Sequence, residues 1–301
     1  MDRRVVRGSL MLVLTALIWG LAFTAQSVGV ETIGVFTFTF ARNALAVVVL
    51  SPLLLRGRRA PAGAARPVGG WKQLLIGGLC CGAVMFAGSV LQLFGIAQTS
   101  VGKAGFITTL YILIVPVFGL LLGRKPKPAF WLSVVIALAG MYLLCVRQGF
   151  SMGRGDLLVL LCAVAFAGHI LVVDHFSARL DGVQLSILQF LVSALLSLLP
   201  MLVIERPALE SLRAAWAPIL YTGALSSGVG FTLQVLAQKD VNPVVASLLM
   251  SLESVFAALG GWIILGQALS GREILGCALV FAAVLLVQWP SKKERMAGGT
   301  I

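Results

Sequence analysis

The sequence predicts an all-α integral membrane protein, and three observations support this fold class. Hydrophobic residues make up 59% of the 301 residues and charged residues only 11%, whereas soluble domains carry about 25% charged residues. The mean hydropathy of the whole chain is +1.01, so one anchor helix cannot account for it. Charged residues cluster at short intervals, and the apolar runs between them reach about twenty residues, enough to cross a bilayer as helices.

The apolar runs predict ten membrane-spanning helices. Stretches such as Leu10–Trp19 and Leu157–Phe166 are apolar at nearly every position, which disfavours a barrel because barrel strands alternate apolar and polar side chains. Glycine, proline and charged residues separate most runs. The expected spans are 8–28, 33–54, 72–95, 103–123, 128–146, 155–174, 183–204, 214–237, 243–265 and 272–289.

The basic residues predict the orientation of these spans. Sixteen Lys and Arg residues fall in tails and loops on one side, Arg42 lies inside a span, and the six on the other side are Lys103, Arg147, Arg154, Arg206, Arg213 and Arg272. Basic residues favour the cytoplasmic side, so both termini are expected in the cytoplasm, which an even number of spans also requires. The expected location is the cytoplasmic (inner) membrane of a bacterium. The net charge of +12 then indicates contact with anionic lipid headgroups rather than with nucleic acid.

The two halves of the chain show signs of an internal duplication. A shift of 147 residues places 8–16 on 155–163 without a gap, and it places Arg42 on Gln189. A shift of 142 residues gives three further pairs, which are Gln92 with Gln234, Ala104 with Ala246 and Tyr111 with Glu253.

Five spans in each half is an odd number, so the second half must enter the membrane from the opposite side. The sequence therefore predicts two inverted five-helix repeats, 1–150 and 151–301, related by an axis in the membrane plane.

Several local patterns resemble those of a known family. They are Ala-Leu-Ile-Trp-Gly-Leu-Ala-Phe at 16–23, Phe-Ala-Arg at 40–42, Thr-Ser-Val-Gly-Lys-Ala-Gly-Phe-Ile-Thr at 99–108, Ser-Leu-Glu-Ser-Val-Phe-Ala-Ala-Leu at 251–259 and Leu-Gly-Gln-Ala-Leu-Ser at 265–270. Together with the five-plus-five organisation, these patterns resemble the EamA-type members of the drug/metabolite transporter superfamily. The resemblance implies export of amino acids or related metabolites, with helices 1–4 and 6–9 around a central cavity. The chain departs from the family in having Ser254 instead of proline and Gln267 instead of glutamate.

Arg42 and Glu253 fall near the middle of their spans. A charged residue there costs roughly 2.5–3.5 kcal/mol on insertion scales, so both are functional candidates. Facing one cavity, they could bind a zwitterion, with Arg42 on the carboxylate and Glu253 on the ammonium group. The alternative is structural, either a mutual salt bridge or pairing of each with backbone and amide groups. A buried carboxylate can also take up a proton, so proton coupling through Glu253 is a further expectation.

Three more polar residues lie inside predicted spans. His169 could carry a proton or contact substrate, or it could be neutral and bonded to a neighbouring carbonyl. Gln92 and Gln234 are equivalent under the 142-residue shift, and they could line a cavity or join packed helices.

Three residues complete the candidate substrate-binding or gating set. Trp19 and Tyr111 lie at mid-span, where they could line a cavity or simply pack between helices. Lys103 lies at the outer start of the fourth span, where it could act at an exit gate or bind an anion, or extend to the headgroups.

These features favour a carrier that moves a small metabolite by alternating access. A membrane-embedded enzyme is the second interpretation, but no catalytic set is visible and only two histidines are present. A channel comes third, because no helix carries a continuous polar stripe. The sequence predicts no catalytic residues, no cofactor and no metal site, and a monomer or homodimer.

Overall fold

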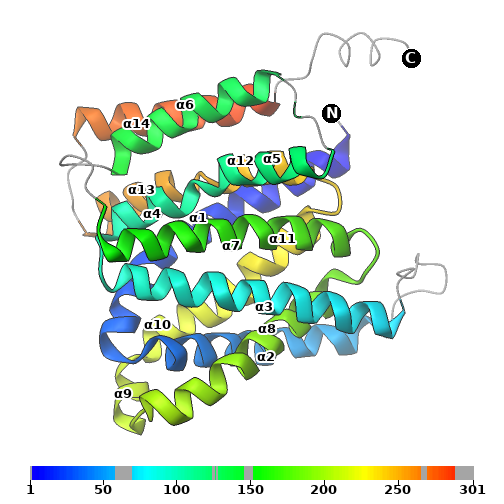
Figure 1. Cartoon of the computed structure of the whole chain (residues 1–301), viewed down its shortest axis with the longest axis vertical. Helices are drawn as coiled ribbons and strands as arrows, with labels where there is room; N and C mark the ends of the chain where they lie inside the picture. The colour runs from blue at the N-terminus through cyan, green and yellow to red at the C-terminus, as the bar shows by residue number, and fades with distance from the viewer. Residues whose placement is uncertain are drawn as a thin grey trace.

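The described part of the structure, a computed structural model, is helical throughout. It comprises residues 2–57, 70–123, 126, 128–145, 152–265 and 270–288, and within them there is no strand. The long helices run side by side in one bundle (Figure 1). The predicted all-α fold class is therefore confirmed. Gln267 and the basic loop at 58–69 lie outside the described residues.

Six helices form the first half of the chain: α1 (Arg3–Thr32), α2 (Val35–Gly57), α3 (Trp71–Ile96), α4 (Val101–Thr109), α5 (Tyr111–Leu121) and α6 (Pro128–Cys145). The second half contains α7 (Arg154–Ser177), α8 (Gly182–Pro200), the π-helix η1 (Met201–Glu205), α9 (Leu209–Ala214), α10 (Trp216–Leu220), the π-helix η2 (Tyr221–Phe231), α11 (Thr232–Ala237), α12 (Pro243–Met250), α13 (Glu253–Leu265) and α14 (Gly271–Gln288).

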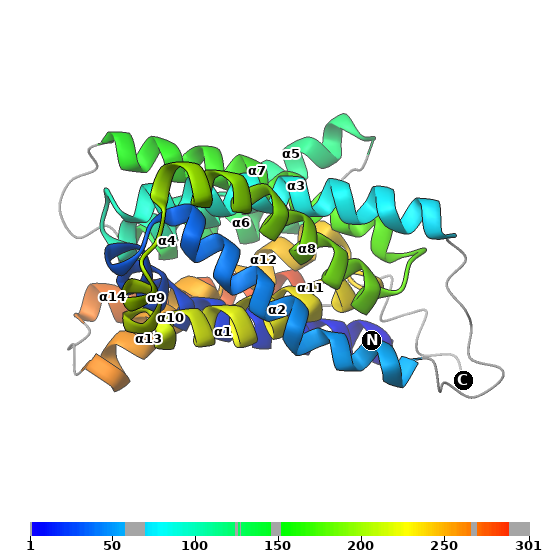
Figure 2. The same ribbon diagram turned by 90° about the horizontal axis from the view of Figure 1, so that it is seen from below.

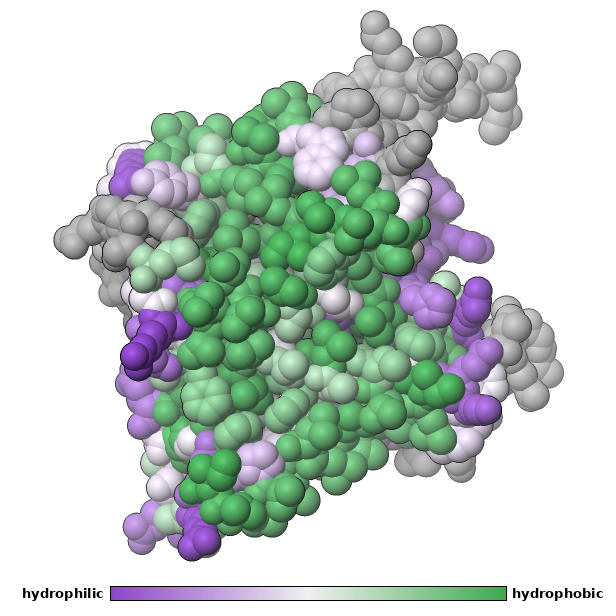
Figure 3. Space-filling model, in the orientation of Figure 1, coloured by the Kyte–Doolittle hydropathy of each residue, from purple (hydrophilic) through white to green (hydrophobic). Residues whose placement is uncertain are grey.

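Seven helical segments of the described chain are long and apolar enough to cross a membrane. They are Arg3–Thr32, Val35–Leu54, Trp71–Ile96, Val101–Leu121, Arg154–Ser177, Gly182–Glu205 and Trp216–Ala237. Shorter apolar helices occupy Phe130–Leu144 and Pro243–Leu259, and α14 occupies the tenth predicted range. The visible face of the bundle carries a broad apolar band with hydrophilic residues gathered at its two ends (Figure 3). Length, composition and this band define a multi-pass membrane protein.

Helix starts follow from capping residues in the sequence. Asp181 accepts hydrogen bonds from the backbone N–H groups of Val183 and Gln184 and so caps α8. The start of α2 has no such residue and is capped from elsewhere, because the Glu205 carboxylate accepts the N–H groups of Phe36 and Thr37 at 2.9 and 2.7 Å. Carboxylates stabilise the electropositive N-terminus of a helix. This cap ties the second half of the chain to the first.

Contacts between the two halves recur in a reciprocal pattern. Helix α3 packs on α7 and α8, while η2 packs on α1 and α2. Helices α2 and α8 pack on each other (Figure 2), and Asn43 Nδ2 donates to Ser193 Oγ between them at 2.9 Å. Helix α6 lies along α14 (Figure 1). There a Cβ on Gly140 would lie 2.7 Å from the Gly276 carbonyl oxygen, so small residues are needed for this close approach.

Two of the predicted spans are broken near their middle. Leu110 separates α4 from α5, and Ser251 and Leu252 separate α12 from α13. At the first break the Leu110 N–H donates to Ile107 and its carbonyl accepts from Ile114. At the second break the Leu252 N–H donates to Leu249 and its carbonyl accepts from Phe256. A shift of 142 residues places these two bonds of the first break on the two named bonds of the second, although the further bond from the Leu113 N–H to Leu110 has no counterpart there among the described residues.

These breaks modify the expectation of continuous helices at 103–123 and 243–265. The span 243–265 is interrupted between α12 and α13 although Ser254 stands where the family has proline. Its hydroxyl, like that of Ser251, donates to a backbone carbonyl one turn earlier in the chain, and such side chains compete with the helical ladder.

Candidate functional site

A cavity in the bundle collects seven of the eight candidate residues. The space in it that is open to the centre of a water molecule is about 40 Å³. The candidates that line it are Trp19, Arg42, Gln92, Tyr111, His169, Gln234 and Glu253. The other lining residues are Phe23, Gln26, Thr108, Phe166, Ile170, Ser226, Phe231 and Met250. Among the described residues, the helices α6, α8, α9, α10 and α14 and the π-helix η1 contribute no lining residue. The seventh predicted span, which the family resemblance placed beside the cavity, therefore supplies none, whereas residues next to both breaks do line it.

Arg42 brings a buried cation to the cavity from α2. The side chain is 3% exposed, and its guanidinium carbon lies 6.0 Å from the centre of the Phe38 ring. Its Nε has no hydrogen-bond partner in the described structure. A buried donor without a partner costs free energy, so this group is prepared to bind an acceptor.

Glu253 brings a buried carboxylate to the same cavity. It is the first residue of α13, directly after the second break, and it is 3% exposed. Tyr111 is the residue directly after the first break, and its hydroxyl donates to Glu253 Oε1 at 3.4 Å. Among the described residues the recorded ion pair within 4.0 Å joins Lys103 and Asp156. The mutual salt bridge considered for Arg42 and Glu253 is thus not formed in this conformation.

His169 reaches the cavity from α7 and contacts α8 behind it. Its Nε2 lies 3.0 Å from the Gln189 side-chain oxygen, an amide carbonyl of the kind that was considered as its partner. Gln189 Nε2 has no partner in the described structure. Gln189 is the residue equivalent to Arg42 under the 147-residue shift.

Side-chain amides add neutral hydrogen-bonding groups to the lining. Gln92 Nε2 donates to Thr108 Oγ1 at 3.3 Å. The side-chain oxygens of Gln26 and Gln234 are buried without a partner in the described structure. Buried polar groups normally have partners, so these oxygens are available to a donor group of a ligand.

Aromatic rings form the apolar part of the cavity. The Trp19 ring centre lies 4.6 Å from that of Phe231, and the indole N–H donates to the Ser226 carbonyl at 3.1 Å. The search for polar residues inside spans missed Phe23, Phe166 and Phe231. Helical spacing offered a signal for some of them, because residues three or four positions apart share a helix face. Phe23 follows Trp19 by four residues, and Phe166 precedes His169 by three.

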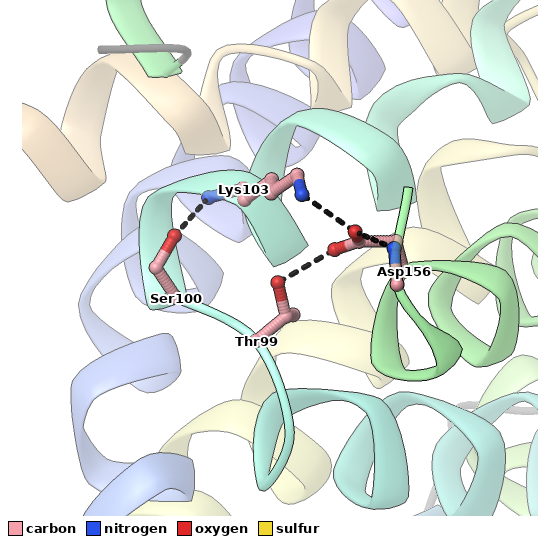
Figure 4. A network of polar contacts seen from close by, with 5 residues as sticks. Thr99, Ser100, Lys103 and Asp156 are labelled. Atoms are coloured by element: carbon pink, nitrogen blue, oxygen red, sulfur yellow. Dashed lines mark hydrogen bonds and ion pairs between the residues drawn. The ribbon is translucent and has the colours of Figure 1, made fainter. Parts of the chain in front are cut away.

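Lys103 is the candidate that does not line the cavity. Its Nζ pairs with Asp156 Oδ2 at 2.5 Å (Figure 4). Thr99 Oγ1 donates to the other carboxylate oxygen at 2.6 Å, and the Gly153 N–H donates to Oδ2 at 2.7 Å. The cluster joins the start of α4 to the start of α7, and thus one half of the chain to the other.

Metal chemistry has no visible donor set in the described part of the chain, where no three His, Cys, Asp or Glu residues gather. A cavity inside a multi-pass bundle, lined by aromatic, polar and charged side chains, is the kind of site that membrane transporters use.

Comparison with known proteins agrees with this class. The profile of the EamA-like transporter family matches residues 6–146 and again residues 153–289. The chain therefore belongs to the EamA-like transporter family. A solved crystal structure has the same fold, with a TM-score of 0.77 at 20% identity, covering 96% of this chain and 98% of the other.

Three relatives match over nearly the whole chain. An uncharacterized transporter of Archaeoglobus fulgidus is 28% identical over 92% of this chain and 84% of its own length. A probable terminal-alkyne amino-acid exporter of Streptantibioticus cattleyicolor is 28% identical over 96% of both chains. The uncharacterized transporter YwfM of Bacillus subtilis is 25% identical over 96% of both. The names of these relatives indicate transporters rather than enzymes.

Proposed function

We propose that this protein is a secondary active transporter that exports a small zwitterionic metabolite of the amino-acid type by alternating access. The observation that carries the proposal is a buried cation and a buried anion that line one cavity without pairing with each other. Two uncompensated charges are costly at this depth. A ligand bearing a carboxylate and an ammonium group would neutralise both.

The proposed architecture is two inverted five-helix halves, 1–150 and 151–301, with ten crossings in all. The reciprocal packing of α3 and η2 supports it, as do the equivalent hydrogen bonds at the two breaks. The two family matches also divide the chain between them. The start of α1 and the end of α14 lie at the same end of the bundle (Figure 1), as an even number of crossings requires. We place that end in the cytoplasm of a bacterium.

The two charges belong to different halves on this scheme. Arg42 is in the first half, and its equivalent Gln189 is neutral. Glu253 is in the second half, and its equivalent Tyr111 is neutral at physiological pH. A zwitterion held by Arg42 through its carboxylate and by Glu253 through its ammonium group would therefore bridge the halves. Such a ligand interacts differently with each arrangement of the halves, which is the condition for a ligand to influence their movement.

Direction and coupling complete the proposal. The name of the amino-acid exporter among the relatives supports export. Glu253 is the proposed site of proton coupling, because it is a buried carboxylate held by one hydroxyl at 3.4 Å. The working unit is a monomer or a homodimer, surrounded by lipid.

Counterflow in proteoliposomes tests the proposal. Purified protein in liposomes preloaded with an unlabelled amino acid should accumulate the labelled form with saturable kinetics. Arg42→Gln and Glu253→Gln should each lower the initial rate at least tenfold, because each removes one of the two charges. The matched controls are Arg179→Gln and Glu31→Gln, which remove exposed charges and should leave the rate within about twofold of wild type. Wild-type rates in both cavity variants would exclude these two residues from the site.

A further inference from the structure

Phe231 occupies an unusual position in the cavity. It is the last residue of the π-helix η2 and is 7% exposed. In a π-helix each turn contains an extra residue, and short π segments are frequent at functional sites. Helix α3, which is equivalent to this part of the second half, is α-helical from Trp71 to Ile96.

The ring of Phe231 is the common contact of the aromatic groups around it. Its centre lies 4.6 Å from that of Trp19, 5.7 Å from His169, 6.2 Å from Phe190 and 6.5 Å from Phe166. Trp19, His169 and Phe166 also line the cavity, whereas Phe190 is fully buried behind it. Neighbouring rings on several sides leave Phe231 little freedom to move aside.

The fold itself does not demand a large side chain here. The 142-residue shift places Phe231 on Ser89, a small residue of α3 that is 1% exposed. The same shift places Gln234 on Gln92, and both of these residues line the cavity. The second half thus matches the first at the glutamine but has a phenylalanine where the first half has a serine.

We propose that Phe231 is the specificity-determining residue of the cavity, whose ring limits the size of the apolar group that a transported zwitterion can carry. The inference rests on the function proposed above. When Arg42 and Glu253 hold the charged groups, the remaining part of the substrate must lie against the aromatic wall. A mismatch of one methylene in an apolar pocket changes selectivity about 10- to 200-fold, and a packed ring cannot relax to absorb it.

Substitutions that shrink and enlarge this side chain test the inference in both directions. Counterflow of labelled alanine, leucine, phenylalanine and tryptophan gives a ratio of tryptophan to alanine kcat/KM for each variant. Phe231→Leu should raise this ratio at least tenfold, and Phe231→Trp should lower it at least tenfold. Phe190→Leu is the matched control, because it removes the same atoms from a ring that touches Phe231 but does not line the cavity. Its ratio should stay within about twofold of wild type.

The outcomes separate the inference from the function on which it rests. Unchanged ratios in both Phe231 variants, or an equal shift in Phe190→Leu, would overturn the role of Phe231 while leaving amino-acid transport intact. Failure of the wild-type protein to transport any of the four amino acids would instead overturn the proposed substrate class. For a variant that does not reconstitute, isothermal titration of the same amino acids into detergent-purified protein gives the corresponding affinity ratio, with the same expected directions.

Discussion

Arg42 and Glu253 are buried ionisable side chains at positions where a charge opposes stability. Each is 3% exposed, and neither is paired with the other within the distance of an ion pair. Native structures seldom keep charges in this state, because a buried charge without a compensating partner lowers stability. A protein can maintain it when the missing partner is the ligand.

Replacing Arg42 by an apolar residue should therefore separate activity from stability. We expect Arg42→Met to abolish most transport and to leave the free energy of unfolding unchanged or raised by about 1–3 kcal/mol, because the cost of burying the cation disappears. Unfolding midpoints of detergent-purified wild type and variant measure the second effect. A loss of more than about 2 kcal/mol would show that Arg42 mainly holds the helices together.

The Lys103–Asp156 pair is expected to stabilise the contact between the start of α4 and the start of α7. Asp156 is 2% exposed and accepts hydrogen bonds from Thr99 and Gly153 as well as from Lys103. Removing one partner leaves the other charge poorly compensated. In a double-mutant cycle of Lys103→Met and Asp156→Asn, we expect a coupling of about 1 kcal/mol, measured by unfolding in detergent. Strictly additive effects of the two substitutions would contradict the link between α4 and α7.

At the scale of helices, the two breaks determine where Tyr111 and Glu253 enter the cavity lining. Each places a cavity-lining side chain at the start of a second short helix, Tyr111 at α5 and Glu253 at α13. Both interruptions are tolerated at membrane depth because the backbone N–H at each break still donates to the carbonyl three residues earlier. The Tyr111–Glu253 hydrogen bond joins the two breaks directly.

A proline scan along α13 tests the second break. Ser254 lies in the first turn of α13, and its N–H makes only a 3.3 Å bond to the Ser251 carbonyl. Proline is tolerated in a first turn, so Ser254→Pro should cost about 1 kcal/mol and retain transport. Ala258→Pro, one turn further, should cost about 3 kcal/mol or more, because it interrupts the helix interior. Equal losses of stability from both substitutions, measured by thermal unfolding, would argue that the span 243–265 is one continuous helix.

Hydrophobic runs predicted where helices lie but not how they are interrupted. The run 103–123 is apolar on both sides of Leu110, so hydropathy contains no signal for the break there. The π-helix η2 was not predicted either, because the hydropathy of a segment does not distinguish a π-helix from an α-helix.

Lining residues of the candidate site could be predicted where a polar side chain interrupts an apolar run of the sequence. Arg42, His169 and Glu253 stand out in apolar runs because charge and imidazole are expensive there. Phe23 and Phe231 do not stand out, since an aromatic residue in a membrane helix is equally suited to packing. Lys103 was identified by its charge, but its pairing with Asp156 is a tertiary contact between segments 53 residues apart.

On the scale of the whole molecule, one bundle holds a cavity whose opposite charges come from different halves of the chain. A channel would need a continuous polar path, whereas the surface exposed inside this cavity is mostly apolar, although polar and charged side chains are as numerous in its lining as apolar and aromatic ones. Close glycine contacts such as that between Gly140 and Gly276 hold α6 and α14 together. These two helices lie away from the cavity lining, so they can support the edge of the bundle while the other helices move.

Access to the cavity from the two sides of the membrane is the most direct test of alternating access. Gln92→Cys and Gln234→Cys, introduced singly into protein whose native cysteines are replaced, place a thiol in the cavity lining of each half. We predict that a membrane-impermeant thiol reagent modifies both positions when added to either side of sealed proteoliposomes, and that excess amino-acid substrate slows both reactions. Modification from one side only, at a rate that substrate does not change, would contradict a cavity that opens alternately to the two sides.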